Sequence, residues 1–233
     1  MKFQQPVLIE SPKFKTALEY RDRFTFGIDK LDLKLQLHLD DMVGIFGDTR
    51  YTNGLATRLV VRSLLPRKHG GVEAENVIVI DADNSSSPYL YVDIARQYGL
   101  HHSKVLRNVI VARQFTIYQL THNIIYDLPR RIQLHKPKVV VISGLLDQFY
   151  QDPYINISET ERLVLQIVTA LHKIKDVFIV LTSRMTNSQI VYPALSRIEI
   201  RAKKEFDETK LNLSIYNNSR LKKVFVTEAE LAS

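Results

Sequence analysis

Short runs of β-branched residues alternate with amphipathic segments along most of this chain, and no other feature constrains its fold as strongly. Five apolar runs are typical of buried strands: residues 42–46, 77–81, 109–112, 138–143 and 177–182. Strands joined by helices of ordinary length form parallel β-α-β units with right-handed crossovers, in a sheet covered on both faces. The sequence therefore predicts an α/β fold.

The segments between these runs carry helix start and stop signals. Four helices are predicted: residues 55–65 before Pro66, a helix capped by Ser87 that ends before Gly99, residues 116–128 before Pro129, and a helix from the capping box at Ser158 and Glu161 to residue 174. Three short strands follow, at residues 197–201, 211–216 and 223–227, with Asn217-Asn218 as a hairpin turn. These last strands predict an antiparallel extension of the sheet.

Ligands of such sheets bind beyond the carboxyl ends of the strands, where residues 47–54, 81–83, 143 and 182–184 fall. The segment 47–54, GDTRYTNG, stands where a P-loop has the pattern G-x-x-x-x-G-K-[ST]. Gly47 matches the first glycine, but Thr52, Asn53 and Gly54 replace the second glycine, the lysine and the hydroxyl residue. We expect a loop of the right place and length for phosphate, without its cation or its magnesium-binding hydroxyl. An ordinary strand-to-helix turn is the alternative.

Carboxylates near the other strand ends are the candidates for catalysis. Asp83 follows the second strand and is placed to polarise a water beside a phosphate, although an acidic cluster at a helix start is equally expected there. The strand at 138–143 ends in Ile142-Ser143 without the acidic residue that would hold magnesium, and Asp147 is expected in the loop beyond it. The sequence thus argues against efficient ATP hydrolysis, and we expect neither a bound metal nor a resident cofactor.

Composition excludes several other classes of protein. The chain has no Cys, which rules out disulfides, thiolate metal sites and Cys nucleophiles. It has no apolar stretch of the roughly 20 residues that a membrane span needs, and its first residues do not resemble a signal peptide. We therefore expect an intracellular protein without a membrane partner. Thirty-two Lys and Arg against 25 Asp and Glu give a net charge of +7, which is compatible with a nucleic acid partner.

Several segments, in order along nearly the whole chain, resemble the ATPase core of the RecA/RadA recombinase superfamily, most closely the RadA-type proteins of archaea and eukaryotes and their paralogues. They are FTFGIDKLD at 24–32, GIFGD at 44–48, IDADN at 80–84 with residues 88–100 after it, VAR at 111–113 and VFVTE at 224–228. The resemblance implies a RecA-like core over residues 24–233, with a mostly parallel sheet, flanking helices and a C-terminal antiparallel extension. It leaves residues 1–23 as an N-terminal segment.

The resemblance also implies roles for single residues. Asp83 stands at the family's catalytic Glu, Ile142 at its strand-terminal Asp, and Arg184 at the Gln that senses nucleotide and couples it to DNA. Phe14 and Ala17 match the F-x-x-A polymerisation segment, whose Phe and Ala insert into a neighbouring core while its strand extends that core's sheet. An ordinary amphipathic stretch is the alternative for this segment.

These observations predict an archaeal-type recombinase paralogue that modulates filament assembly in homologous recombination and DNA repair without efficient ATPase activity. Its expected partners are DNA, single-stranded in the first instance, and a RadA-type recombinase or another paralogue. Phe14 and Ala17 are the predicted partner contacts, and the predicted DNA contacts are Arg113, Arg184, Arg197, Arg201, Lys203 and Lys204. A solvated sheet edge is the alternative for the C-terminal basic residues.

Two further functions remain open. The first is a true ATPase in which Arg50 or Arg58 replaces the missing lysine. The second is a scaffold that makes only protein contacts. The expected location is the cytoplasm, associated with the nucleoid, in an archaeon, or the nucleus in a eukaryote.

Overall fold

The computed structural model describes residues 23–151, 154–184, 198–204, 210–217, 220–227 and 230. Phe14, Ala17 and Arg197 lie outside these residues, so their roles remain predictions. The division of the chain at residues 23 and 24 likewise remains a prediction.

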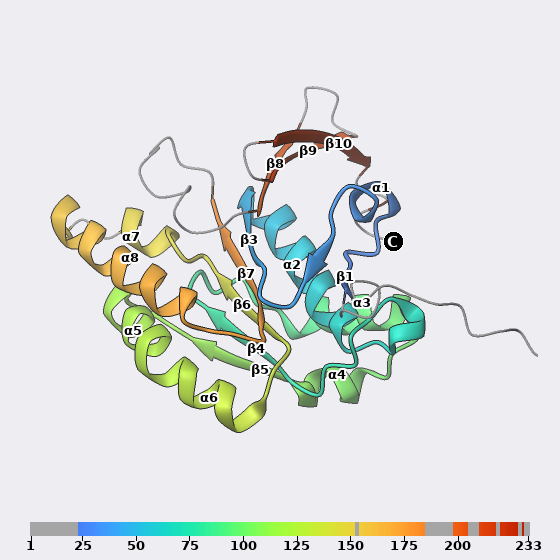
Figure 1. The fold of residues 1–233 in the computed structure, drawn as a ribbon, viewed down its shortest axis with the longest axis horizontal. Coiled ribbons are helices and arrows are strands. Elements are labelled where there is room, and N and C mark those ends of the chain that lie inside the picture. Colours follow the sequence, from blue (N-terminus) through green and yellow to red (C-terminus); the bar gives the residue numbers. More distant parts are fainter. Residues whose placement is uncertain are drawn as a thin grey trace, which may run out of the picture.

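An eight-stranded sheet runs through the centre of the molecule (Figure 1), in the order β10-β9-β8-β3-β7-β6-β4-β5. Its strands are β3 (Met42–Gly47), β4 (Val77–Asp81), β5 (Val109–Arg113), β6 (Val139–Ser143), β7 (Phe178–Ser183), β8 (Ile198–Lys204), β9 (Lys210–Asn217) and β10 (Arg220–Thr227). The six strands from β8 to β5 are parallel to one another, and β9 and β10 form an antiparallel hairpin. The predicted α/β fold with a mostly parallel sheet is therefore confirmed.

The C-terminal extension differs in one respect from the prediction. The first of the three last strands, β8, pairs in parallel with β3, with Ile45 opposite Ile200, and is antiparallel only to β9. The antiparallel part is thus the β9–β10 hairpin. A separate two-stranded sheet, β1 (Arg23–Phe24) and β2 (Leu37–His38), precedes the main sheet.

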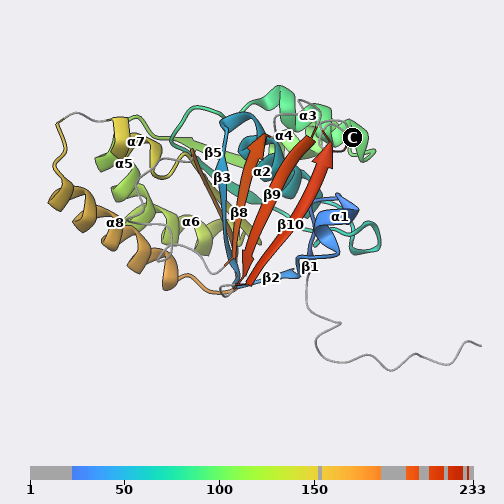
Figure 2. The ribbon, with the colours of Figure 1, turned by 90° about the horizontal axis from the view of Figure 1, so that it is seen from above.

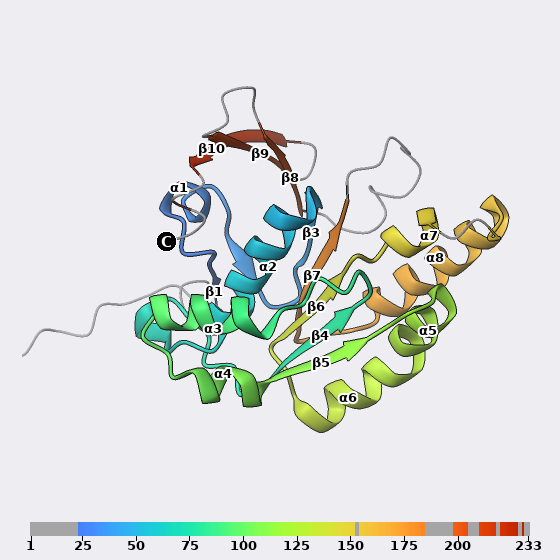
Figure 3. The same cartoon turned by 180° about the vertical axis from the view of Figure 1, so that it is seen from behind.

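Helices cover both faces of the parallel part of the sheet (Figures 1 and 3). The helices are α1 (Asp29–Asp32), α2 (Thr49–Ser63), η2 (Arg67–His69), α3 (Pro88–Gln97), α4 (His102–Asn108), α5 (Ile117–His122), η3 (Asn123–Asp127), α6 (Leu128–His135), α7 (Asp147–Gln151) and α8 (Ile157–His172). One apolar core lies between the sheet and α2, α3 and α4, and a second lies between the sheet and α5, α6 and α8. No helix in the described part of the chain is long and apolar enough to span a bilayer.

Two helix boundaries differ from the sequence prediction. Pro129 does not end the helix that begins at Ile117, because a π-helical turn, η3, precedes it and α6 continues to His135. The wider turn accommodates a residue that lacks an N–H and whose ring would clash with a regular helix. The cap of α8 is Asn156, whose Oδ1 accepts the N–H of Glu159 at 2.8 Å, and not Ser158. The short helices α4 and α7 have no clear periodic signal in the sequence.

We call residues 23–41, which precede β3, the lead-in segment. A buried charged network attaches this segment to α2. The carboxylate of Asp32 accepts the N–H groups of Phe26, Gly27 and Ile28 at 2.7 to 3.1 Å. The guanidinium of Arg58, almost fully buried, donates to the carbonyl of Phe26 at 3.1 Å and to the Tyr98 hydroxyl at 3.0 Å. Burial raises the pKa of Asp32 and lowers the pKa of Arg58, because both charges are partly removed from water.

The last strand is held against the same lead-in segment. Lys34 donates to the carbonyl of Lys223 at 3.0 Å, and Lys222 donates to the carbonyl of Lys34 at 3.2 Å. Glu230 pairs with Lys30 at 2.8 Å, and the hydrogen bond from Lys30 lowers the pKa of Glu230 to about 2. These contacts join the two ends of the described chain beside β10.

Replacing Arg58 by Ala should lower the free energy of unfolding by about 3 kcal/mol, because buried carbonyls of the lead-in segment lose their donor. Urea denaturation measures this loss. The control is Arg96→Ala on the exposed face of α3, which should change stability by no more than about 0.5 kcal/mol. Equal effects of the two substitutions would contradict a structural role for Arg58.

Candidate functional site at the carboxyl edge of the sheet

The parallel register brings the ends of the six strands from β8 to β5 to one edge of the sheet (Figure 3). Asp81 at the end of β4 lies opposite Ser143 of β6 on one side and Arg113 of β5 on the other. β3 and β7 end beside them, with Phe46 opposite Ser183. Polar side chains predicted from four separate segments of the sequence are thus gathered at one edge.

The junction of β3 and α2 differs from the predicted phosphate loop. β3 ends at Gly47 and α2 begins at Thr49, so one residue, Asp48, separates strand from helix. The Asp48 carboxylate caps the helix by accepting the N–H of Arg50 at 2.9 Å. A helix N-terminus attracts anions through its unpaired N–H groups, and here the chain's own carboxylate occupies that position. Residues 49–54 are helical, and the prediction of a loop of P-loop length is wrong.

The residues predicted to line the phosphate loop make contacts within the fold. Thr52 is buried and donates to the carbonyl of Thr49 at 3.3 Å. Asn53 donates to the carbonyl of Ser85 at 2.8 Å and so joins α2 to the turn after β4. A Cβ at Gly47 would overlap the carbonyl oxygen of Ala202 on β8, whereas one at Gly54 would meet open space. Thr52 and Asn53, at the second glycine and lysine positions of the P-loop pattern, are thus both engaged in contacts within the fold.

Asp81 is the most deeply buried carboxylate of the edge. Its Oδ1 accepts the Ser143 hydroxyl at 3.2 Å and the N–H of Ser85 at 3.0 Å, and its Oδ2 lies 3.4 Å from Nε of Arg113. Burial raises the pKa of Asp81, and the nearby carboxylate of Asp83 raises it further. Because its side chain has no exposed surface, Asp81 positions its neighbours and does not face a substrate.

Asp83, the predicted counterpart of a catalytic Glu, is half-buried in the turn after β4. Its Oδ1 accepts the N–H of Ser85 at 3.3 Å. Gly144, with φ of 65°, lies so close that a Cβ there would overlap the Asp83 side chain. The short side chain is therefore packed against the backbone that follows β6.

Asp147 and Arg184 form a second pair at this edge. Asp147 is not in a loop, as predicted, but is the buried first residue of α7. Its Oδ1 accepts the Ser183 hydroxyl at 2.7 Å and the N–H of Arg184 at 2.9 Å, and its Oδ2 lies 3.6 Å from Nε of Arg184. Arg184 also donates to the hydroxyl of Thr49 at 3.3 Å. It thus connects β7, α7 and the first turn of α2.

Arg113 and Arg184, both predicted DNA contacts, share one arrangement. Each arginine side chain is about half exposed, 49% for Arg113 and 55% for Arg184, and each is paired with an aspartate side chain that is almost wholly buried. The other predicted DNA contacts within the described strands, Arg201, Lys203 and Lys204, lie on β8, which pairs in parallel with β3 and has Arg201 opposite Phe46.

The two arginines proposed to replace the P-loop lysine lie in different surroundings. Arg58 is engaged with the lead-in segment and Tyr98, so this assignment is wrong. Arg50 is exposed on the first turn of α2, with its guanidinium 5.9 Å from the centre of the Tyr51 ring. In the part of the chain that the structure describes, no group of three or more His, Asp or Glu residues is arranged to hold a metal ion.

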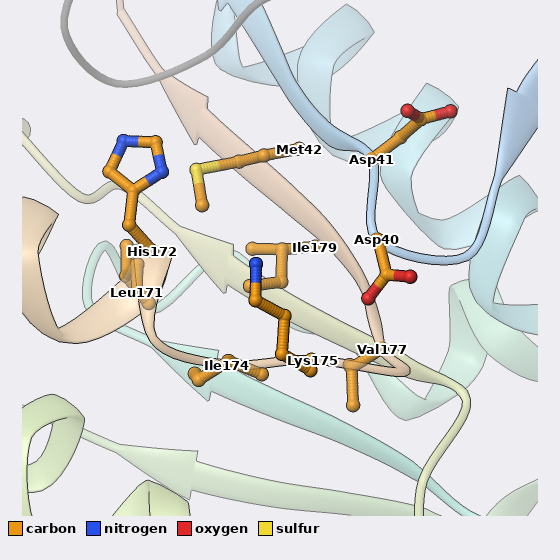
Figure 4. Close-up of a pocket in the computed structure, with 9 residues that line it drawn as sticks. All are labelled: Asp40, Asp41, Met42, Leu171, His172, Ile174, Lys175, Val177 and Ile179. Carbon is orange, nitrogen blue, oxygen red and sulfur yellow. The ribbon is translucent and has the colours of Figure 1, made fainter.

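A pocket of about 240 Å³ opens at the opposite edge of the sheet, at the amino ends of β3 and β7 (Figure 4). Asp40, Asp41, His172 and Lys175 contribute its polar groups. Both carboxylates also support the surrounding loops, because Asp40 accepts the N–H of Asp176 at 2.6 Å and Asp41 accepts the N–H of His38 at 2.7 Å. This pocket is separate from the carboxyl edge that the sequence singled out.

Sequence reasoning missed Gln148 and the contact between Asp147 and Ser183, which complete the edge. Gln148 donates to the carbonyls of Ala82 and Gln114, both at 2.8 Å, and so bridges the ends of β4 and β5. Ser183 and Asp147 join β7 to α7. The one available signal was the acidic residue shortly after the strand at 138–143, since an Asp near a strand end is expected to bond to neighbouring N–H groups.

Comparison with known proteins agrees with this architecture. A family model described as Rad51 matches residues 23–205. The meiotic recombination protein DMC1/LIM15 homologs of Mus musculus and Homo sapiens are each 28% identical over 197 residues, which cover 77% of this chain and 56% of theirs. The DMC1 homolog of Lilium longiflorum is 28% identical over 177 residues, 73% of this chain and 50% of its own. The chain spans about half the length of these relatives.

Replacing Asp83 by Asn should lower the pKa of Asp81, because a neighbouring negative charge is removed. Carboxyl-detected NMR titration measures the shift, and Asp93→Asn on exposed α3 is the control that should leave Asp81 unchanged. The raised pKa means that the folded state binds the proton of Asp81 more tightly than the unfolded state does. The free energy of unfolding therefore falls as the pH rises from 3.8 through the titration of Asp81 in the folded protein. An unaltered Asp81 titration in Asp83→Asn would contradict the coupling.

Proposed function

Because the chain belongs to the Rad51 family, we propose that it acts in homologous recombination by joining recombinase assemblies on DNA, without efficient ATP turnover of its own. Matching relatives are named as meiotic recombination proteins, which supports a role in the same process. The single observation that supports the loss of turnover is the junction of β3 and α2. The net charge of +7 supports contact with a polyanion.

Phosphate binding at a strand-to-helix junction needs a run of free backbone N–H groups and a cation above them. In this chain α2 starts one residue after β3, and Asp48 already accepts an N–H of its first turn. A triphosphate at this position would meet the Asp48 carboxylate, and the lysine position of the P-loop pattern holds the uncharged Asn53. Like charges in close contact repel, so the junction disfavours nucleotide.

We predict that isothermal titration with ATP and magnesium detects no micromolar binding, and that a phosphate-release assay detects no turnover above background. The substitution Asp83→Asn should leave both readings unchanged, because Asp83 is packed against Gly144 and serves no hydrolytic step. Micromolar binding together with turnover that disappears in Asp83→Asn would overturn the proposal in favour of an ATPase.

Docking to a recombinase subunit is proposed to use strand addition through the N-terminal segment. The sheet of this chain illustrates the acceptor that such a core offers. Among the described strands β5 is the last of the sheet and pairs with β4 alone, and Val111 on it is partly exposed. Pro88, Leu106, Val111 and Arg113 line a hollow beside this edge. An open strand edge next to an apolar hollow suits an added strand with an anchoring side chain.

The substitution Phe14→Ala should weaken binding to a Rad51-family recombinase of the same organism by about 30-fold, because a buried aromatic anchor typically contributes about 2 kcal/mol or more. Biolayer interferometry with the full chain measures the affinity. Phe3→Ala, an aromatic of the same N-terminal stretch outside the F-x-x-A pattern, is the matched control. Full affinity of the Phe14→Ala variant would remove the docking claim.

DNA contact is proposed to involve Arg113 and Arg184 at the carboxyl edge. A guanidinium has five N–H donors in a planar fork, so one side chain can serve a carboxylate and a phosphate together. The buried carboxylates of Asp81 and Asp147 hold these two guanidinium groups at the surface. The edge thus offers two positioned cations to a phosphate backbone.

A further inference from the structure

The three C-terminal strands carry a polar and aromatic outer face that the folding of the chain does not explain. We call the residues Arg201, Asn212, Ser214, Leu221, Lys223 and Phe225 the outer ribbon face. Cross-strand pairing places Arg201 opposite Ser214 and Ser214 opposite Lys223, which makes one row across β8, β9 and β10. Phe225 pairs with Asn212 in the next row.

The two faces of this ribbon differ sharply. Leu213, Ile215, Val224 and Val226 point inward and are buried in the core that also contains α2. On the outer face Phe225 is 46% and Leu221 is 49% exposed, and Lys223 is exposed as well. Figure 2 looks onto this face, and no helix of the described chain lies over it.

A solvated sheet edge explains only part of this composition. Edge lysines prevent strand-to-strand aggregation, and Lys222 at the edge of β10 is occupied with the carbonyl of Lys34. Phe225 lies on the same strand but has no such role, because an exposed aromatic ring does not discourage pairing with another strand. A large aromatic ring held in water beside cations is characteristic of a binding surface.

We propose that the outer ribbon face binds single-stranded nucleic acid, with Phe225 stacking on a base and Arg201 and Lys223 contacting phosphates. This inference rests on the proposed DNA function and adds the surface and the strand form. Alternate residues of a strand are about 6.8 Å apart on one face, so the row of cations lies within one nucleotide of the aromatic ring. Sheets that bind single strands combine these two kinds of side chain.

The chemistry of the face favours a single strand over the other occupants. In a duplex the bases are stacked on one another, so their faces are closed to an aromatic side chain. In protein–protein interfaces the central residues are depleted in Lys, whereas here Lys223 lies in the row next to Phe225 on β10. A polyanion with unstacked bases can pair with the cations through its phosphates and stack a base on the aromatic ring.

The test measures binding of the full chain to a labelled thymidine 20-mer and to a duplex of equal length, by fluorescence anisotropy over a salt series. Phe225→Ala should weaken binding of the single strand about tenfold, since loss of one base–aromatic stack typically has that size. Phe225→Tyr, which keeps a stacking ring, should retain wild-type affinity. Tyr89→Ala on α3, another exposed aromatic, is the matched control and should have no effect.

The charge contacts are tested in the same series. Lys223→Gln should reduce the slope of log K against log salt by about 0.7, the value for one phosphate contact on a single strand. Lys68→Gln removes the same charge from η2 and should leave the slope unchanged. Urea denaturation of each variant checks that the fold is intact.

The outcomes separate this inference from the proposed function. No binding of wild-type chain at low salt would overturn DNA binding as a whole. Binding by wild type that is equally strong in Phe225→Ala and Lys223→Gln would overturn the outer ribbon face alone. Equal affinity for the duplex would overturn the preference for a single strand. Loss of recombinase binding in Phe225→Ala with unchanged DNA binding would assign the face to a protein partner.

Discussion

The carboxylate of Asp48 accepts the N–H of Arg50 immediately after β3 ends, and the arrangement of the carboxyl edge depends on this cap. Because the helix starts at Thr49, the Thr49 hydroxyl is placed to accept from Arg184, which in turn pairs with Asp147 of α7. Asn53, one turn further along, reaches the carbonyl of Ser85 and fixes the turn that carries Asp83. A longer loop at this junction would shift each of these contacts. The same capping interaction that stabilises α2 therefore disfavours a phosphate at the helix start.

Arg113 and Arg184 illustrate how a buried carboxylate can hold a cationic side chain in position at the surface. An unpaired carboxylate inside a protein is costly, so Asp81 and Asp147 each need their polar partners. Those partners include the serines at the ends of β6 and β7 as well as Arg113 and Arg184. Holding the guanidinium groups in place lowers the side-chain entropy that they lose when a ligand binds. The carboxyl edge thus holds two half-exposed arginine side chains in place through buried carboxylates, as the proposed DNA contact requires.

The sequence was sufficient for the strands and the order of the layers, because runs such as VIVID and VVVIS have few alternatives to a buried parallel strand. It was insufficient where two local signals favour different structures or where a contact joins distant segments. At the junction of β3 and α2, glycine positions indicated a loop, but Asp48 is a strong cap and residues 49–54 continue the helix. At Pro129 the sequence predicted the end of a helix, but the chain stays helical because a π-helical turn precedes the proline. The pairing of Asp147 with Arg184 depends on two segments that are far apart in the sequence, so no local pattern reveals it.

The contact between Lys34 and the last strand affects how the molecule reaches its native state. Lys34 and the carbonyl of Lys223 are separated by 189 positions, so this contact closes a very long loop. Contacts between such distant residues form late and slowly, because the entropy of loop closure must be overcome before they stabilise anything. During synthesis on the ribosome the parallel strands can assemble while the lead-in segment still lacks its partner on β10. Among the described strands β9 and β10 are synthesised last, so their inner apolar side chains are the last of this core to become available for packing.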